Sequence, residues 1–189
     1  MRSFVLSATL LAASFAPLAV SVSAQQLLPA QSEIGFVSRQ MGAPVSGRFK
    51  TFDAKLAFDP AKPAAASIAF SVDMGSATLG DRETDAELRK PVWFAVARFP
   101  KANLQSTAVK RLDATRFEVA GKLTIKGLSS DVVVPVTLAQ TGAQTVATGS
   151  FPIKRLTFRI GDQEWSDTSM VADAVQVNFR FALTGVPEL

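Results

Sequence analysis

Apolar and polar residues alternate with a period of two through residues 32–185, the pattern of β-strands that bury one face. Near the start, Ile34 and Phe36 occupy the apolar positions of the first such segment. The sequence Lys126-Gly127 between two later segments fits a tight hairpin turn, because glycine tolerates a positive φ. The pattern therefore predicts an antiparallel meander with one buried face. The apolar positions of the other segments are Val45, Gly47 and Phe49; Ala54, Leu56 and Phe58; Ile68, Phe70 and Val72; Leu104; Phe117, Val119, Gly121, Leu123 and Ile125; Val132, Val134, Val136 and Leu138; Ala147, Gly149, Phe151 and Ile153; and Val175, Val177, Phe179, Phe181 and Leu183.

One short helix is predicted between Asp81 and Arg89. Asp81 can cap its N-terminus, Arg89 and Lys90 suit its C-terminal end, and Pro91 ends it. A single short helix cannot cover eight or nine strands. The sheet must therefore close into a barrel or fold into a sandwich.

The N-terminus has the features of an export signal. A positive charge at Arg2 precedes an uncharged apolar stretch from Phe4 to Val22, and small residues follow it. This predicts a cleaved signal peptide over residues 1–24 and a mature domain over residues 25–189. A retained membrane anchor fits less well, because Pro17 interrupts the apolar stretch.

An outer-membrane barrel would also begin with a signal peptide. Such barrels carry aromatic girdles at both membrane interfaces. This chain has no Tyr, and Trp93 and Trp165 are its only tryptophans. The outward-facing positions of nearly every predicted strand are also polar, which favours a barrel in water.

Two absences exclude whole classes of chemistry. Without Cys there is no disulfide, and without His there is no Ser-His-Asp triad, no Cys-His pair and no His-based zinc site. The formal net charge of +4 falls to +3 when Arg2 leaves with the signal peptide. Because the basic residues are dispersed, we expect no nucleic-acid partner.

A set of short motifs follows in order through nearly the whole mature chain, and the most specific of them is Gly121-Lys122-Leu123-Thr124-Ile125-Lys126-Gly127. In this order and spacing, the motifs resemble the YceI-like family of polyisoprenoid-binding periplasmic proteins. The resemblance implies a mainly-β fold, a single eight-stranded antiparallel lipocalin-like β-barrel with one short α-helix, located in the periplasm. It also implies that isoprenoid chains, including prenyl phosphates and quinones, bind inside the barrel, and some relatives are dimers. The other motifs are Ser32-Glu33-Ile34-Gly35-Phe36, Gly47-Arg48-Phe49 with Phe52, Leu56-Ala57-Phe58-Asp59-Pro60, Thr84-Asp85-Ala86-Glu87-Leu88, Trp93-Phe94, Phe99-Pro100, Arg155 with Phe158 and Gly161, and Asp173 with Val175.

The helical motif departs from the family pattern. Many relatives carry Arg-Asp and then His-Leu there, whereas this chain has Thr84-Asp85 and Glu87-Leu88. Any head-group contact made by those Arg and His side chains does not carry over.

The expected ligand-binding residues are the inward-facing aromatic positions together with large side chains in two irregular segments. In any barrel such phenylalanines also serve as ordinary core, and the irregular aromatic residues fit packing under a loop equally well. Arg155 is the candidate polar contact, with an ion pair to a nearby acid as the alternative. The full set is Phe36, Phe49, Phe58, Phe70, Trp93, Phe94, Phe99, Leu123, Phe151, Arg155, Phe158, Trp165, Phe179 and Phe181.

Two acidic groups are better explained by solvation than by chemistry. They are Asp81, Glu83, Asp85 and Glu87 on the helix, and Asp162, Glu164, Asp167 and Asp173, which lack EF-hand spacing. The leading hypothesis is a non-catalytic carrier of an isoprenoid lipid or quinone that needs no cofactor and no metal. One alternative is a stress or electron-transport accessory protein with a filled barrel and a membrane electron-transport partner. The other is an enzyme on isoprenoid substrates that uses Asp85 or Glu87. A homodimer remains open.

Overall fold

The computed structural model describes residues 24–189. The predicted signal peptide therefore lies, but for Ala24, outside the described residues. Within residues 24–189, no helix is long and apolar enough to cross a membrane.

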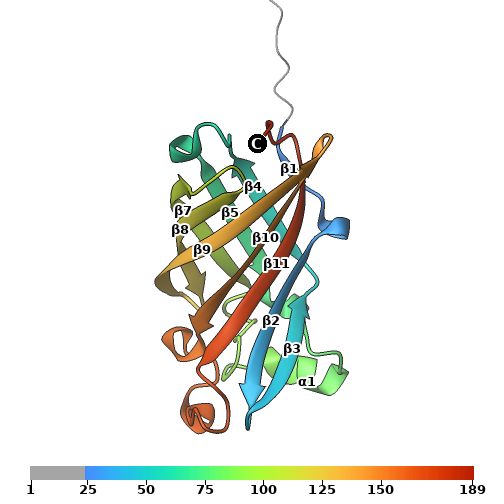
Figure 1. The fold of residues 1–189 in the computed structure, drawn as a ribbon. Coiled ribbons are helices and arrows are strands. Elements are labelled where there is room, and N and C mark those ends of the chain that lie inside the picture. Colours follow the sequence, from blue (N-terminus) through green and yellow to red (C-terminus); the bar gives the residue numbers. More distant parts are fainter. Residues whose placement is uncertain (1–23) are drawn as a thin grey trace, which may run out of the picture.

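Nine longer strands and two strands of two residues form one curled antiparallel sheet (Figure 1). All nine predicted segments are strands, which confirms the mainly-β prediction. The count differs from the eight strands expected. The strands are β1 (Gln26–Leu27), β2 (Glu33–Gln40), β3 (Ala43–Phe49), β4 (Phe52–Ala57), β5 (Ser67–Asp73), β6 (Ala77–Thr78), β7 (Lys101–Arg111), β8 (Arg116–Ile125), β9 (Leu128–Thr141), β10 (Gln144–Lys154) and β11 (Ala174–Thr184).

The extra strand arises where one long strand is interrupted. Only Lys50 and Thr51 separate β3 from β4, yet β3 pairs with β2 whereas β4 pairs with β5. The backbone groups at this interruption bond elsewhere, because Lys50 N–H and Thr51 N–H both donate to Ser76. Counted as two halves of one bent strand, β3 and β4 give a barrel of eight long strands.

This bend leaves a seam in the barrel wall. Within residues 24–189, no backbone hydrogen bond joins β4 to the strands on its side away from β5. There β1, which pairs with β11, lies against β4. The Gln25 side chain links the two sides of this seam by hydrogen bonds to the backbone of Phe58, directly after β4. Its amide donates to the Phe58 carbonyl, and its Oε1 accepts from Phe58 N–H at 2.8 Å.

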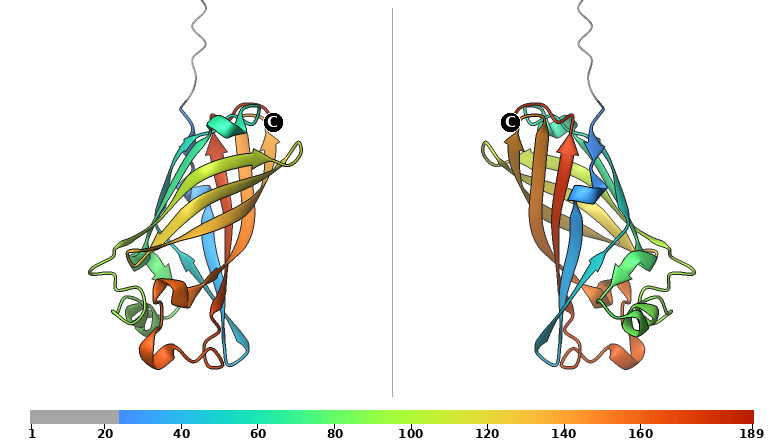
Figure 2. Two further views of the ribbon diagram at one scale, coloured as in Figure 1. Left: turned by 90° about the vertical axis from the view of Figure 1, so that its left-hand side faces the viewer. Right: turned by 90° about the vertical axis from the view of Figure 1, so that its right-hand side faces the viewer.

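The helix α1 (Arg82–Leu88) forms as predicted and lies at the end of the barrel opposite the described chain termini (Figures 1 and 2). Asp81 caps it by accepting from Thr84 N–H at 2.9 Å. We call this end the helix end. The 3-10 helices η4 (Arg155–Phe158) and η5 (Gln163–Trp165) also lie there. The remaining 3-10 helices are η1 (Pro29–Gln31), η2 (Pro63–Ala65) and η3 (Met74–Ser76).

The predicted hairpin turn between β8 and β9 is present. Lys126 and Gly127 both have positive φ, 49° and 74°, as a two-residue type I′ turn requires. Lys126 adds a tertiary role, because its ammonium donates to the carbonyls of Pro91 and Arg159. The turn thereby ties the sheet to the two irregular segments of the helix end. Partial burial lowers the pKa of Lys126, and Asp162 opposes that shift.

Candidate binding cavity

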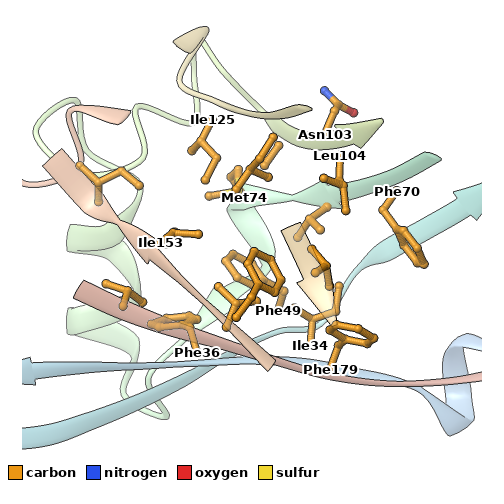
Figure 3. A pocket seen from close by; sticks show the side chains of 18 of the residues that line it. Ile34, Phe36, Phe49, Phe70, Met74, Asn103, Leu104, Ile125, Ile153 and Phe179 are labelled. Atoms are coloured by element: carbon orange, nitrogen blue, oxygen red, sulfur yellow. The ribbon is translucent and has the colours of Figure 1, made fainter. Parts of the chain in front are cut away.

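The barrel encloses an apolar cavity of about 620 Å³. This volume lies in the range of sites that hold a small molecule. Its walls come from every long strand of the barrel, and side chains from opposite walls converge on one space (Figure 3). Of the labelled side chains in that view, Asn103 alone carries nitrogen and oxygen, and it lies at the edge of the cluster, away from the central space.

The burial of the phenylalanines shows where the interior is hollow. Phe117, Phe151 and Phe181 are buried, and Phe117 is only 1% exposed. They belong to a core that also contains Leu138 and Val186. By contrast, five inward-facing phenylalanines are only half-buried, because one side of each ring faces the cavity instead of another side chain. These five are Phe36, Phe49, Phe58, Phe70 and Phe179.

Two glycines hold aromatic rings against the wall. Phe36 lies directly across from Gly47, and a Cβ atom at Gly47 would sit 2.2 Å from the ring of Phe36. Phe179 lies across from Gly149 in the same way, at 2.3 Å. Each ring thus covers the backbone of a glycine, which keeps it from projecting across the cavity. The Phe179 ring also stacks on Phe181, with centroids 4.8 Å apart.

Twelve of the fourteen predicted ligand-binding residues line the cavity. They are Phe36, Phe49, Phe58, Phe70, Trp93, Phe94, Leu123, Phe151, Arg155, Trp165, Phe179 and Phe181. Phe158 does not, because it is 1% exposed within a separate core under the helix end. Phe99 does not either. Its ring contacts Gly127 and the guanidinium of Arg98.

The cavity opens at the helix end. Most of its solvent-exposed lining residues are polar side chains of that end: Gln40, Thr84, Glu87, Lys90 and Glu164. At the opposite end the lining consists largely of buried residues of the core that contains Phe117, Leu138 and Val186. Gln25 also lines that end, but its side-chain amide is already hydrogen-bonded to Phe58. The site therefore has an apolar interior and one polar mouth.

Some mouth residues could have been found from the sequence. Ser38 and Gln40 continue the inward parity of Ile34 and Phe36 along β2, so a change from apolar to polar on the inner face marks the rim. Thr84, Lys90 and Glu164 lie on the helix and in loops, where alternation gives no orientation. The sequence indicates Glu87 as an acid of the helix but not as a rim residue.

Arg155 connects the irregular backbone segments of the helix end through its guanidinium group. It is 2% exposed, and its guanidinium donates five hydrogen bonds of 2.6–3.0 Å to backbone carbonyls. All five of its N–H donors are therefore used within the protein. Burial lowers the pKa of Arg155, and the charge of Asp173 opposes that shift. The acceptors are the carbonyls of Ala172, Ile160, Gly161, Trp165 and Val171.

Neither sequence-based interpretation of Arg155 describes these contacts. No donor remains for a ligand head group. The ion-pair alternative is wrong within residues 24–189, because Asp173 does not pair with Arg155 and accepts from Leu156 N–H at 2.9 Å. Irregular backbone leaves carbonyls without strand partners, and a guanidinium satisfies several of them at once.

The helix acids are engaged in local structure. Asp85 accepts from Leu79 N–H at 2.7 Å, and hydrogen bonds from Thr78 and Leu79 lower the pKa of its carboxyl group. Glu87 forms an ion pair with Lys90. Across residues 24–189, no group of three or more Asp and Glu residues is placed to hold a metal ion. Two carboxylates, Glu87 and Glu164, line the cavity, and Glu87 is the one paired with a lysine.

The chain was compared with known proteins. The YceI-like domain matches residues 26–183. A UPF0312 protein of Azotobacter vinelandii is 32% identical over 88 residues, which cover 47% of this chain and 46% of that relative. Protein YceI of Salmonella arizonae is 31% identical over 96 residues, covering 51% and 50%. The chain spans about half the length of the curated relatives it matches.

Solved structures give longer matches. BcnA of Burkholderia cenocepacia is 42% identical with a TM-score of 0.80, covering 82% of this chain and 98% of BcnA. A polyisoprenoid binding domain from Saccharophagus degradans, implicated in plant cell wall breakdown, is 15% identical with a TM-score of 0.70, covering 87% and 99%. The second likeness is one of fold alone.

Proposed function

This chain belongs to the YceI-like family, and on that basis we propose that it is a non-catalytic binding protein that carries a long-chain isoprenoid lipid of prenyl phosphate or quinone type. The observation that carries the proposal is the apolar cavity with its half-buried aromatic lining. A structural neighbour is named as a polyisoprenoid binding domain, which supports the same ligand class.

The chemistry of the cavity suits such a ligand. An isoprenoid chain offers apolar area and no hydrogen bonds, so it needs no dedicated polar partners inside the barrel. Each buried five-carbon unit stabilises a complex by up to about 4 kcal/mol, at roughly 0.8 kcal/mol per carbon. A few units therefore suffice for tight binding after the costs of association are subtracted.

The proposal extends to location and assembly. With residues 1–24 acting as a cleaved signal peptide, the protein works in the periplasm, where a carrier shields an apolar chain from water. A homodimer and a membrane electron-transport partner are the assemblies to look for.

The test is native mass spectrometry of the protein purified from a periplasmic extract, followed by organic extraction of bound molecules. A co-purifying lipid in the prenyl mass series supports the carrier function. A ligand-free mass that persists after incubation with quinone and prenyl phosphate contradicts it and favours the accessory-protein alternative.

A variant pair tests the site itself. Phe179→Arg places a charge in the cavity and should lower lipid affinity at least about 100-fold, because burying an unpaired charge is costly. The neighbouring Asn178 is exposed on the outer face. Asn178→Arg is the matched control and should bind like the wild type. Equal affinity of two folded variants would contradict the cavity as the binding site.

A further inference from the structure

The mouth of the cavity is poor in available positive charge. Among residues 24–189, the charged side chains that line the cavity are Glu87, Lys90, Arg155 and Glu164. Arg155 has all of its donors bound to backbone carbonyls. Lys90 is paired with Glu87. Arg155 therefore has no donor left for an anionic head group, and the charge of Lys90 is balanced by Glu87.

The remaining charge at the mouth is negative. Glu164 is exposed and makes no side-chain hydrogen bond or ion pair with the described residues. The exposed pair of Lys90 and Glu87 is weak and could open. Opening it would offer one ammonium group but would release a second carboxylate. Either way, Glu87, Lys90 and Glu164 together carry one net negative charge.

The uncharged groups at the mouth suit a neutral polar group. Trp93 and Trp165 pack with ring centroids 5.7 Å apart beside Glu164 and form an apolar platform. Ser38 and Gln40 also line the cavity, and their side chains make no hydrogen bonds to the described residues. The rim thus offers hydroxyl and amide groups and one carboxylate acceptor.

From this arrangement, and resting on the proposed function, we infer that the bound isoprenoid has an uncharged, hydrogen-bonding head, a hydroxyl or carbonyl, and not a phosphate. A phosphate monoester carries about −1.5 to −2 charges at pH 7 and would meet lining charges with a net negative sum, in which the exposed ammonium of Lys90 is already balanced by Glu87. A hydroxyl can donate to a carboxylate such as that of Glu164 or accept from an amide such as that of Gln40.

Two probes of equal chain length test this inference: geranylgeraniol and geranylgeranyl phosphate. Their affinities are measured by displacement of a fluorescent lipid from the mature protein. The alcohol should bind at least about tenfold more tightly than the phosphate. Equal or tighter binding of the phosphate overturns the inference but leaves the carrier function intact. If no probe binds, the carrier function fails, and the inference fails with it.

Reversing the charge of Glu164 tests whether this residue causes the preference for the alcohol over the phosphate. Glu164→Lys should raise the affinity for the phosphate relative to the alcohol by about tenfold or more, because it replaces a repulsive charge with an attractive one. Glu83→Lys makes the same charge change at an exposed residue of helix α1 that does not line the cavity. This control should leave the ratio unchanged, which separates a local contact from the effect of net charge. An unaltered ratio in folded Glu164→Lys protein overturns the role of Glu164.

Discussion

The glycine opposite Phe36 makes a specific prediction about the volume of the cavity. A Cβ atom at Gly47 would lie 2.2 Å from one ring carbon of Phe36 and 2.7 Å from two others. Real atoms cannot approach so closely, so Gly47→Ala must displace the ring. The wall lies behind the ring, so the ring turns into the cavity. Only this flexible side chain stands in the way, and Gly47 has no positive φ, so the protein should stay folded.

The size of the effect follows from the space that the ring would occupy. A phenyl ring has six carbons, so it displaces about one five-carbon unit of an isoprenoid chain. The lost burial is worth up to about 4 kcal/mol. Lipid affinity should therefore fall by about 100- to 1,000-fold. The free energy of unfolding should change by no more than about 1 kcal/mol, because alanine costs less backbone entropy than glycine.

The assay is displacement of a fluorescent lipid, with urea unfolding as a check on stability. Gly35→Ala is the matched control on the same pair of strands, because a Cβ there meets only the Gly47 carbonyl, at 3.4 Å. The double variant Phe36→Ala with Gly47→Ala removes the displaced ring and should recover most of the affinity. A folded Gly47→Ala protein with wild-type affinity would refute the argument, and so would a double variant as weak as the single one.

Three further predictions concern stability. Arg155→Lys keeps the charge but has three donors for five carbonyls, so the free energy of unfolding measured in urea should fall by about 2–4 kcal/mol; an unchanged value would contradict the role of the guanidinium. Hydrogen bonds from Thr115 and Arg116 lower the pKa of Asp113 to about 2 from its usual 3.8, so its stabilising effect is complete above pH 3.8 and is lost as the pH falls toward 2. Asp113→Asn should therefore lack the part of acid destabilisation that the wild type shows in this interval, as pH-dependent thermal melts would reveal. Gln25→Ala removes both seam hydrogen bonds and should cost about 1–2 kcal/mol, with faster amide exchange confined to β4 and β1; uniform acceleration across the barrel would argue against a local seam.

Alternation of residue types predicted the strands well because each strand has one solvent-exposed face and one buried face. Most of the inward set from Ile34 to Leu183 follows from parity, but Val109 does not, because a bulge between Ser106 and Ala108 shifts the parity of β7. The break at Lys50 is visible in the same pattern, because the inward positions change from odd numbers up to Phe49 to even numbers from Phe52. What alternation does not show is that β3 pairs with β2 whereas β4 pairs with β5. The pattern records which face a residue occupies and not which neighbouring strand it bonds.

The irregular segments were predicted less well for a related reason. Without a period, the sequence does not show that Trp93 lines the cavity while Phe158 packs beneath it. Arg155 was recognised as unusual, but its partners are backbone carbonyls, which every residue has. The roles of Gly47 and Gly149 depend on which residue lies opposite each of them, and that is fixed by register.

The pairing of the first long strand with the last strand has a consequence for how this barrel is assembled. β2 pairs with β11, and Ser32 accepts from the N–H of Ala182, 150 residues later in the chain. While the chain is being synthesised, β2, β3 and β6 can pair as one sheet and β4, β5, β7, β8, β9 and β10 as another, but the aromatic faces of both sheets remain in water. Closure waits for β11, which joins the two sheets in a long-range event, so we expect it to limit the rate of folding. A chain that ends before β11 would leave two sheets with exposed edges, prone to aggregation, and would not form a smaller barrel.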